Sequence, residues 1–136
     1  MSVVAELIKT EADGGLSFGN YELNEKAKKE DYECAGNLYK VKTFKEITKL
    51  ERDGMFVYES VPGTSVHDFQ ATDEGVSFTV CGPEDAQITV GVKEDTEYEI
   101  TVGGKSTGKV KSNLGGKLNL SVELAGNGDV PVVIRM

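Results

Sequence analysis

The chain has 136 residues, 38% of them hydrophobic, and a formal net charge of −8. A chain of this length forms one domain by default and buries about two-thirds of its unfolded surface. The acidic balance disfavours nucleic acid as a partner, because binding to a phosphate backbone needs a net basic face.

The first residues contain neither the basic stretch nor the long apolar stretch of a signal peptide. No apolar run approaches the roughly 20 residues that a membrane helix needs. We therefore expect a cytoplasmic protein without a membrane partner, in a single domain of residues 1–136 with possible halves at 1–75 and 76–136. In that compartment we expect Cys34 and Cys81 to be unpaired thiols, because disulfides are rare there.

The N-terminal part of the chain combines short apolar runs with glycine turns. Residues 3–8 are apolar apart from Glu6 and predict either a strand or a short helix. A turn signal at residues 13–15 precedes residues 16–18, where apolar and polar residues alternate again. Residues 24–36 are polar and predict a surface loop or one helical turn.

Two interpretations compete for residues 43–52. Thr43 followed three residues later by Glu46 matches a helical capping box. The Asp53-Gly54 pair is instead a strong signal for a hairpin turn that leads into a strand. We choose the hairpin and keep the helix as the alternative, since propensity arguments of this kind are weak.

The clearest pattern lies between residues 86 and 124, where apolar residues occupy every second position. Period two is the signature of strands with one buried face. A three-residue loop of Gly103, Gly104 and Lys105 would join two of these strands. It places Tyr98 opposite Val110, with charge pairs on the other face: Glu99 with Lys109 and Glu97 with Lys111. A shift of one residue would turn the apolar set toward water.

The last apolar run, residues 130–134, contains Pro131, which cannot donate a hydrogen bond to a strand ladder. We therefore expect an edge strand there. Eight to eleven short strands separated by glycine turns predict an all-β protein, an antiparallel β-sandwich or barrel-like sheet packing. At most one short helix is expected, near residues 24–36 or 43–51.

Candidate catalytic and metal-binding residues are few. His67, the only histidine, lies next to Asp68 and close to Ser65, but neighbouring residues of a strand point to opposite faces. A pair of His67 with Cys81 across neighbouring strands is the other arrangement. Calcium ligands could come from Asp73-Glu74 with Glu84-Asp85, or from residues 127–129, although neither set has EF-hand spacing. We expect no catalytic residues, no metal and no cofactor.

Charge is unevenly distributed along the chain. Residues 53–99 carry eleven acidic residues and one lysine, a net charge of −10, whereas residues 26–49 and 100–136 are each +3. A solvated acidic surface explains this distribution. The sharper hypothesis is a homo-oligomer that forms through edge strands at residues 3–8 or 130–134, with complementary charges at the rim.

Four stretches, residues 38–44, 55–63, 82–88 and 113–118, resemble a family of small intracellular proteins of anaerobic gut bacteria that often carry the label endosialidase. The resemblance covers nearly the whole chain and implies an activity on sialic acid polymers, although no residue role follows from it. Residues 98–120 are also similar to the accessory β-sandwich modules of carbohydrate-active enzymes.

Sialidases resemble one another in holding the carboxylate of sialic acid with three arginines, whose planar fork suits that group. This chain has two, Arg52 and Arg135. We therefore favour a non-catalytic β-sandwich module for binding or self-assembly, and keep a glycan-binding or glycosidase domain as the alternative. Tryptophan, the best stacking platform for a sugar, is absent. Five tyrosines could replace it: Tyr21, Tyr32, Tyr39, Tyr58 and Tyr98.

Overall fold

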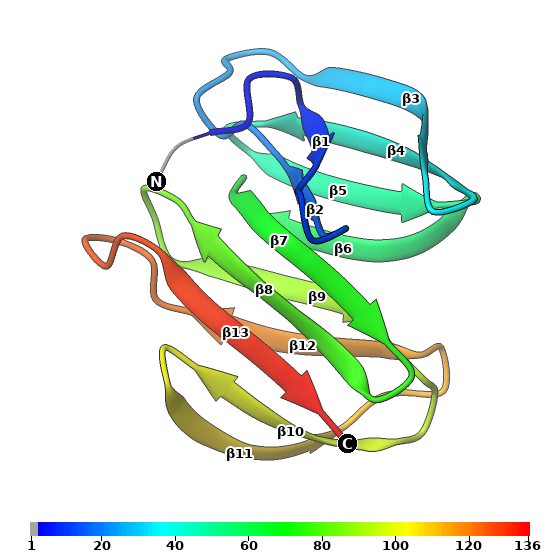
Figure 1. Ribbon diagram of the computed structural model, residues 1–136. Coiled ribbons are helices and arrows are strands. Elements are labelled where there is room, and N and C mark those ends of the chain that lie inside the picture. The colour runs from blue at the N-terminus through cyan, green and yellow to red at the C-terminus, as the bar shows by residue number, and fades with distance from the viewer. Residues whose placement is uncertain (1–2) are drawn as a thin grey trace.

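Two antiparallel β-sheets face each other in the computed structural model, which describes residues 3–136 (Figure 1). This confirms the predicted all-β sandwich, with thirteen strands rather than eight to eleven and no helix in the described residues. Accordingly, residues 3–136 contain no helix that could cross a membrane.

The seven-stranded sheet has the order β1-β2-β7-β8-β13-β10-β11. Its strands are β1 (Ile8–Thr10), β2 (Leu16–Phe18), β7 (Ser65–Thr72), β8 (Gly75–Cys81), β13 (Val130–Arg135), β10 (Glu97–Val102) and β11 (Lys105–Lys111). The six-stranded sheet has the order β12-β9-β6-β5-β4-β3. Its strands are β12 (Lys117–Val122), β9 (Ala86–Gly91), β6 (Met55–Val61), β5 (Ile47–Arg52), β4 (Asn37–Phe44) and β3 (Ala27–Cys34).

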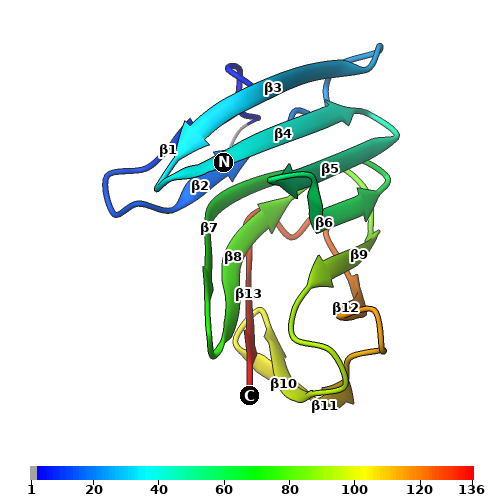
Figure 2. The same ribbon diagram turned by 90° about the vertical axis from the view of Figure 1, so that its right-hand side faces the viewer.

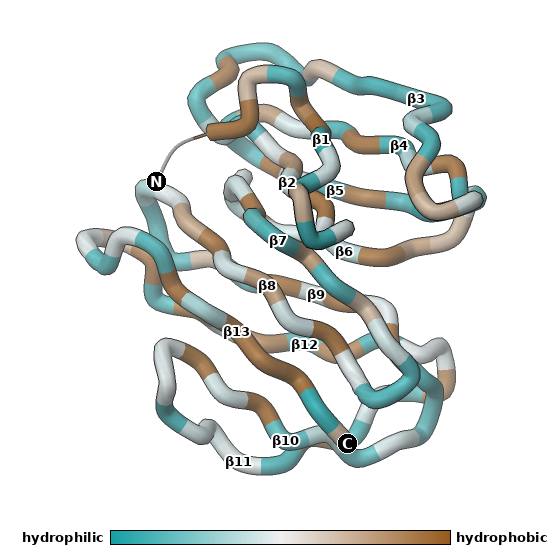
Figure 3. Tube along the Cα trace, in the orientation of Figure 1, coloured by the Kyte–Doolittle hydropathy of each residue, from teal (hydrophilic) through white to brown (hydrophobic). Residues whose placement is uncertain are grey.

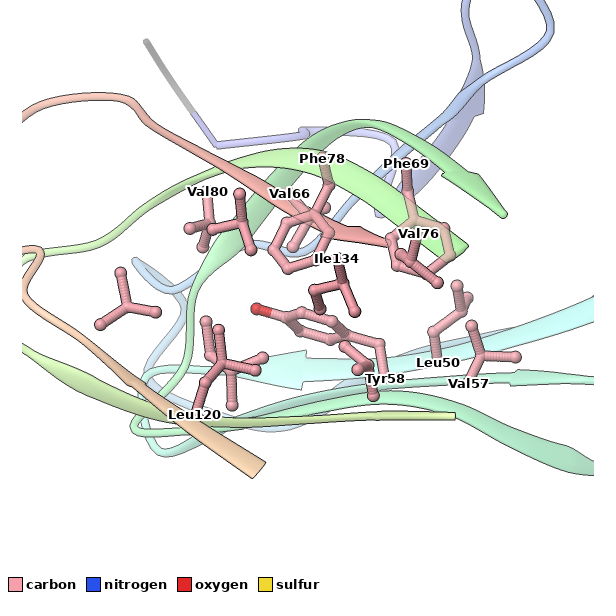
Figure 4. Packing of buried hydrophobic residues seen from close by; sticks show 14 of the residues in the cluster. Leu50, Val57, Tyr58, Val66, Phe69, Val76, Phe78, Val80, Leu120 and Ile134 are labelled. Atoms are coloured by element: carbon pink, nitrogen blue, oxygen red, sulfur yellow. The ribbon is translucent and has the colours of Figure 1, made fainter. Parts of the chain in front are cut away.

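The core lies between the two sheets and is built by the period-two alternation, which Figure 3 shows as brown and pale bands along the strands. Tyr58 of β6 is at its centre. Its ring packs edge-on against Phe18 at 5.3 Å and Phe78 at 5.6 Å between centroids. Figure 4 shows Tyr58 reaching from the six-stranded sheet toward Phe69 and Phe78 of the other sheet. Edge-on packing suits the charge distribution of aromatic rings, so both sheets share this aromatic cluster.

The hairpin of β10 and β11 has the predicted register but not the predicted loop. Tyr98 lies opposite Val110, and the two charge pairs also face each other as expected. The loop has two residues, Gly103 and Gly104, both with positive φ. The loop is one residue shorter than predicted, and a β-bulge between Ile100 and Thr101 compensates for this difference. The pairs further along the hairpin therefore keep the predicted register.

In the region 43–52, β4 ends at Phe44, residues 45–46 turn, and β5 begins at Ile47, so the hairpin interpretation is confirmed and there is no helix there. Asp53 and Gly54 have φ of 50° and 79°, the left-handed pair that a two-residue hairpin loop needs. The prediction of a loop or helical turn at residues 24–36 is wrong, because most of that range is β3. Its charged residues are tolerated since β3 is the edge strand of the six-stranded sheet and most of its side chains face solvent.

Both terminal predictions are also wrong. Only Ile8 of residues 3–8 belongs to a strand, because the chain turns at residues 5–7 and Leu7 has φ of 73°. β13 is not an edge strand but lies between β8 and β10. Pro131 fits there because its carbonyl accepts a hydrogen bond from Gly103 N (2.8 Å), beyond the last residue of β10. Its missing N–H therefore faces the turn rather than the ladder.

The chain passes from one sheet to the other through Pro62, Gly63 and Thr64. The hydroxyl of the buried Thr64 contacts those of Tyr58 (2.8 Å) and Ser60 (2.7 Å). Its carbonyl accepts a hydrogen bond from the hydroxyl of Thr48 (2.7 Å). Each buried polar group in this crossover has a partner, so the network fixes how the two sheets meet.

Candidate functional site

The two sheets separate toward the end of the sandwich that carries the C-terminus (Figure 2). A cleft of about 440 Å³ opens there between the turn of β7 and β8 on one side and the ends of β6 and β9 on the other. This volume is in the range of small-molecule sites in proteins, and we take the cleft as the candidate functional site.

Three basic residues line this cleft: Arg52, Lys93 and Lys117. In the described part of the chain, the lysine ion pairs are those of Lys28, Lys40, Lys109 and Lys111, and the three cleft residues take part in none. Lys93 is the only base within the acidic segment 53–99. The cleft lining therefore has three bases and one carboxylate, that of Asp73, in a protein that is acidic as a whole.

Arg52 is positioned by the turn between β5 and β6. It pairs with Met55 across the hairpin. The Asp53 side chain accepts a hydrogen bond from Leu38 N (2.9 Å), and Asp53 N donates to the Leu38 carbonyl (2.7 Å). These bonds attach the turn to β4, so the backbone that carries Arg52 is fixed before any ligand arrives.

Lys93 belongs to the loop between β9 and β10. Its backbone N donates to the hydroxyl of the buried Tyr98 (3.0 Å), and its carbonyl accepts from the Ser112 hydroxyl (2.5 Å). Ser112 also exchanges hydrogen bonds with Thr96 of the same loop. Two loops that are distant in sequence are thus joined, and preorganisation of this kind lowers the entropy cost of binding.

Lys117 begins β12 and places its ammonium group 4.6 Å from the centroid of the Phe56 ring. Met55 beside it is 72% exposed. The cleft mouth therefore combines cations with an aromatic ring and a flexible apolar side chain. Such a mixture suits a ligand that carries both a negative charge and a less polar face.

A second hollow of about 310 Å³ continues along the same side of the molecule and shares Arg52, Val57 and Phe69 with the cleft. Tyr39 lines this continuation and is half-buried. Tyr58 and Tyr98 are buried in the core. Of the five predicted sugar-stacking tyrosines, Tyr39 lines the second hollow, and Tyr98 lines the cleft as a buried side chain. Phe56 is the aromatic ring that sequence reasoning missed.

The candidate catalytic residues lie on the neighbouring strands β7 and β8. The Ser65 hydroxyl is buried and donates to the Gly19 carbonyl (2.8 Å). His67 lies opposite Thr79, while Cys81 lies opposite Ser65, so the β7–β8 register does not pair His67 with Cys81. Burial raises the pKa of the Cys81 thiol. Since a thiolate is the reactive form, this cysteine is not activated.

The candidate calcium ligands are separated by the fold. Asp73 and Glu74 form the turn before β8, whereas Glu84 and Asp85 follow its other end, about 20 Å away for a strand of this length. The Asp85 carboxylate accepts hydrogen bonds from Leu124 N (3.0 Å) and from the next backbone N. Within residues 3–136, no group of three or more His, Cys, Asp or Glu side chains is arranged to hold a metal.

A carboxylate pair, Asp13 and Asp68, lies where β2 meets a bulge of β7. The Gln70 amide donates to both carboxylates, at 3.0 and 3.3 Å. A backbone hydrogen bond from Gly15 lowers the pKa of Asp13, while burial and the neighbouring Asp13 raise the pKa of Asp68. Ionisation of Asp68 therefore opposes folding.

We expect Asp68→Asn to stabilise the protein at pH 7 by about 0.5 kcal/mol, a small value for a group close to solvent. The gain should shrink as the pH falls through the raised pKa of Asp68 and be absent below the ordinary range of aspartate pKa values, because Asp68 is then protonated in both states. Urea unfolding at pH 7 and at low pH measures this, with Glu84→Gln on an exposed turn as the control for net charge. Destabilisation at pH 7 would contradict the prediction.

Comparison of the chain with protein-family models, with curated proteins and with solved structures found no match. The fold and the cleft together describe an antiparallel β-sandwich that carries a preorganised cationic hollow at one end. Sequence reasoning missed this cluster because Arg52, Lys93 and Lys117 are far apart in the chain. Only the fold brings the end of β5, the β9–β10 loop and the start of β12 together.

Proposed function

We propose that this protein is a non-catalytic binding module that holds an anionic ligand in the cleft at the open end of the sandwich. The observation that carries the proposal is the excess of positive charge around one cleft, where Arg52, Lys93 and Lys117 outnumber the single carboxylate of Asp73. None of the three bases forms an ion pair within the described residues. A negatively charged group on the ligand supplies the missing partner. Arginine in particular binds a planar carboxylate through two parallel hydrogen bonds.

The ligand class that fits best is a glycan that ends in an acidic sugar. A sugar ring has a C–H face that packs on an aromatic side chain, and Phe56 with its neighbour Met55 offers such a surface beside the cations. The resemblance to proteins labelled endosialidase points to the same class. Cleavage is not part of the proposal, because Ser65 is hydrogen-bonded in the core and the Cys81 thiol is not activated.

The test is a titration of isotope-labelled protein with N-acetylneuraminic acid, followed by NMR chemical shifts. We expect saturable shifts at residues of the cleft and no shifts with neutral N-acetylglucosamine. Arg52→Ala and Lys93→Ala should each weaken binding about tenfold, the effect of losing one charge-assisted hydrogen bond. No release of sialic acid from polymers is expected in a parallel assay.

Lys109→Ala is the matched control, because it also removes one positive charge but from β11, where Lys109 pairs with Glu97. It should leave the affinity unchanged. Equal shifts with the neutral sugar, or equal weakening by Lys109→Ala and Arg52→Ala, would contradict an anion site in this cleft.

A further inference from the structure

The two sheets have four edge strands in total: β1, β11, β3 and β12. β1 has only three residues. β3 is bulged and mostly charged, and β11 is bulged and carries three lysines. Short length, bulges and charges are the devices that keep an edge from pairing with another chain. β12 is neither short nor bulged, and it has only one charged residue, Lys117.

Backbone hydrogen bonds show which residues of β12 face its open edge. The Gly116 carbonyl accepts from Val92 N (2.8 Å), toward β9. Backbone groups alternate in direction along a strand, so the even-numbered residues 118, 120 and 122 also face β9. The odd-numbered residues face the other way, as Lys117 confirms, since its carbonyl accepts from Asn113 N (3.1 Å) in the adjacent loop.

Two residues are left with open backbone groups at this edge. The Lys117 backbone is occupied by Asn113, whose side chain accepts from Lys117 N (3.0 Å). The Glu123 carbonyl accepts from the Asn127 side chain (3.0 Å). Between them, Asn119 and Ser121 have no strand beside them on the edge side in the described part of the chain. Each offers one donor and one acceptor.

These two residues are complementary to a second copy of the same strand. In an antiparallel pair related by a twofold axis through Leu120, Asn119 lies opposite Ser121 of the other copy. By the same symmetry, Ser121 lies opposite Asn119 of the other copy. The two pairs make four backbone hydrogen bonds. The same register places Lys117 opposite Glu123 of the other copy on the exposed face, at both ends of the contact.

The buried face agrees with this register. Leu118 lies opposite Val122 of the second copy, and Leu120 lies opposite Leu120 of the second copy. All three side chains point into the core of their own copy. A register shifted by one residue would oppose buried and exposed side chains. One register therefore satisfies the backbone, the core face and the charges at once.

We propose that two copies of this chain associate through β12, joining their six-stranded sheets into one continuous sheet across a twofold axis. The site is distinct from the terminal strands expected from the sequence: residues 3–8 contribute only Ile8 to the short edge strand β1, and β13 is a central strand. Figure 2 shows β12 at the outer margin of its sheet, next to β9. The backbone groups of Asn119 and Ser121, which make the contact, take no part in the cleft, so the Ser121 variants test the dimer apart from ligand binding. Lys117 is shared, because it lines the cleft and lies at both ends of the contact.

Ser121→Pro tests the contact at the backbone. Ser121 N faces the open edge, so proline removes no backbone hydrogen bond within one copy but deletes two of the four between copies. Proline and alanine both remove the hydrogen bond that the Ser121 hydroxyl donates to Gln87 Oε1 (2.9 Å). Sedimentation at about 100 μM should show a dimer for the natural chain, and Ser121→Pro should raise its dissociation constant at least about tenfold. Ser121→Ala keeps the N–H and is the matched control. It should remain dimeric.

A charge exchange tests the register without proline. Lys117→Glu places like charges at both ends of the contact, and Glu123→Lys does the same with the opposite sign. Each single variant should dissociate more readily, while the double variant should recover dimerisation. High salt should reduce these differences. A natural chain that is monomeric at low and high salt, or a double variant as weak as the singles, would overturn the proposal.

Discussion

Gly63→Ala is expected to destabilise the protein by about 3 kcal/mol, which lowers the melting temperature by about 10–15 °C for a domain of this size. Gly63 lies in the crossover between the sheets. A β-carbon there would be 2.0 Å from the carbonyl oxygen of Phe44. The obstacle is backbone, so the crossover itself must move, and the hydroxyl network around Thr64 moves with it. Thermal unfolding followed by circular dichroism measures the change.

Gly82→Ala is the matched control for this prediction. A β-carbon at Gly82 would have its nearest neighbour, Leu124 Cδ1, at 3.4 Å, an ordinary contact. The same added methyl group should therefore change stability by no more than about 1 kcal/mol. Equal stability of the two variants would show that the short distance between Gly63 and the Phe44 carbonyl does not determine the stability of the fold.

Tyr58→Ala is expected to cost about 3–5 kcal/mol, the usual effect of removing a buried aromatic side chain. Tyr58 is fully buried and contacts Phe18, Phe69 and Phe78, so its loss leaves a cavity that both sheets line. Since a domain is stable by only about 5–15 kcal/mol, this variant should unfold at much lower urea concentration.

Tyr58→Phe separates the ring from its hydroxyl. Burial raises the pKa of Tyr58, so the hydroxyl keeps its proton. Thr64 retains the Ser60 hydroxyl as a partner when the Tyr58 hydroxyl is removed. We therefore expect a loss of only about 1 kcal/mol. An equally large loss for both variants would assign the stabilisation to the hydrogen bond and not to ring packing.

The alternation between residues 86 and 124 was enough to predict strands there, because one buried face imposes period two whatever the partner strand is. The register of the β10–β11 hairpin also followed from its side chains. The loop length did not, since the bulge after Ile100 allows the same distant pairs with one residue fewer in the turn. Pattern identifies which residues share a face more reliably than how the chain turns.

The position of β13 could not be predicted from Pro131, because a proline is compatible with a central strand when its nitrogen faces a turn. The polar strand β3 was missed for a related reason: an edge strand with exposed side chains has no apolar alternation to detect. The cleft depends on contacts between three segments distant in sequence. Local patterns contain no information about such contacts.

The central place of β13 has a consequence for the order in which the chain can fold. β13 follows the other twelve strands of the two sheets in the chain, yet it separates β8 from β10 in the seven-stranded sheet. Until it emerges from the ribosome, a nascent chain exposes the edges of both neighbours and lacks Val132 and Ile134 from its core. Completion of this sheet therefore waits for a strand that is distant in sequence from both of its neighbours' hairpins, and such non-local pairing favours slow folding and exposure to aggregation until β13 is in place.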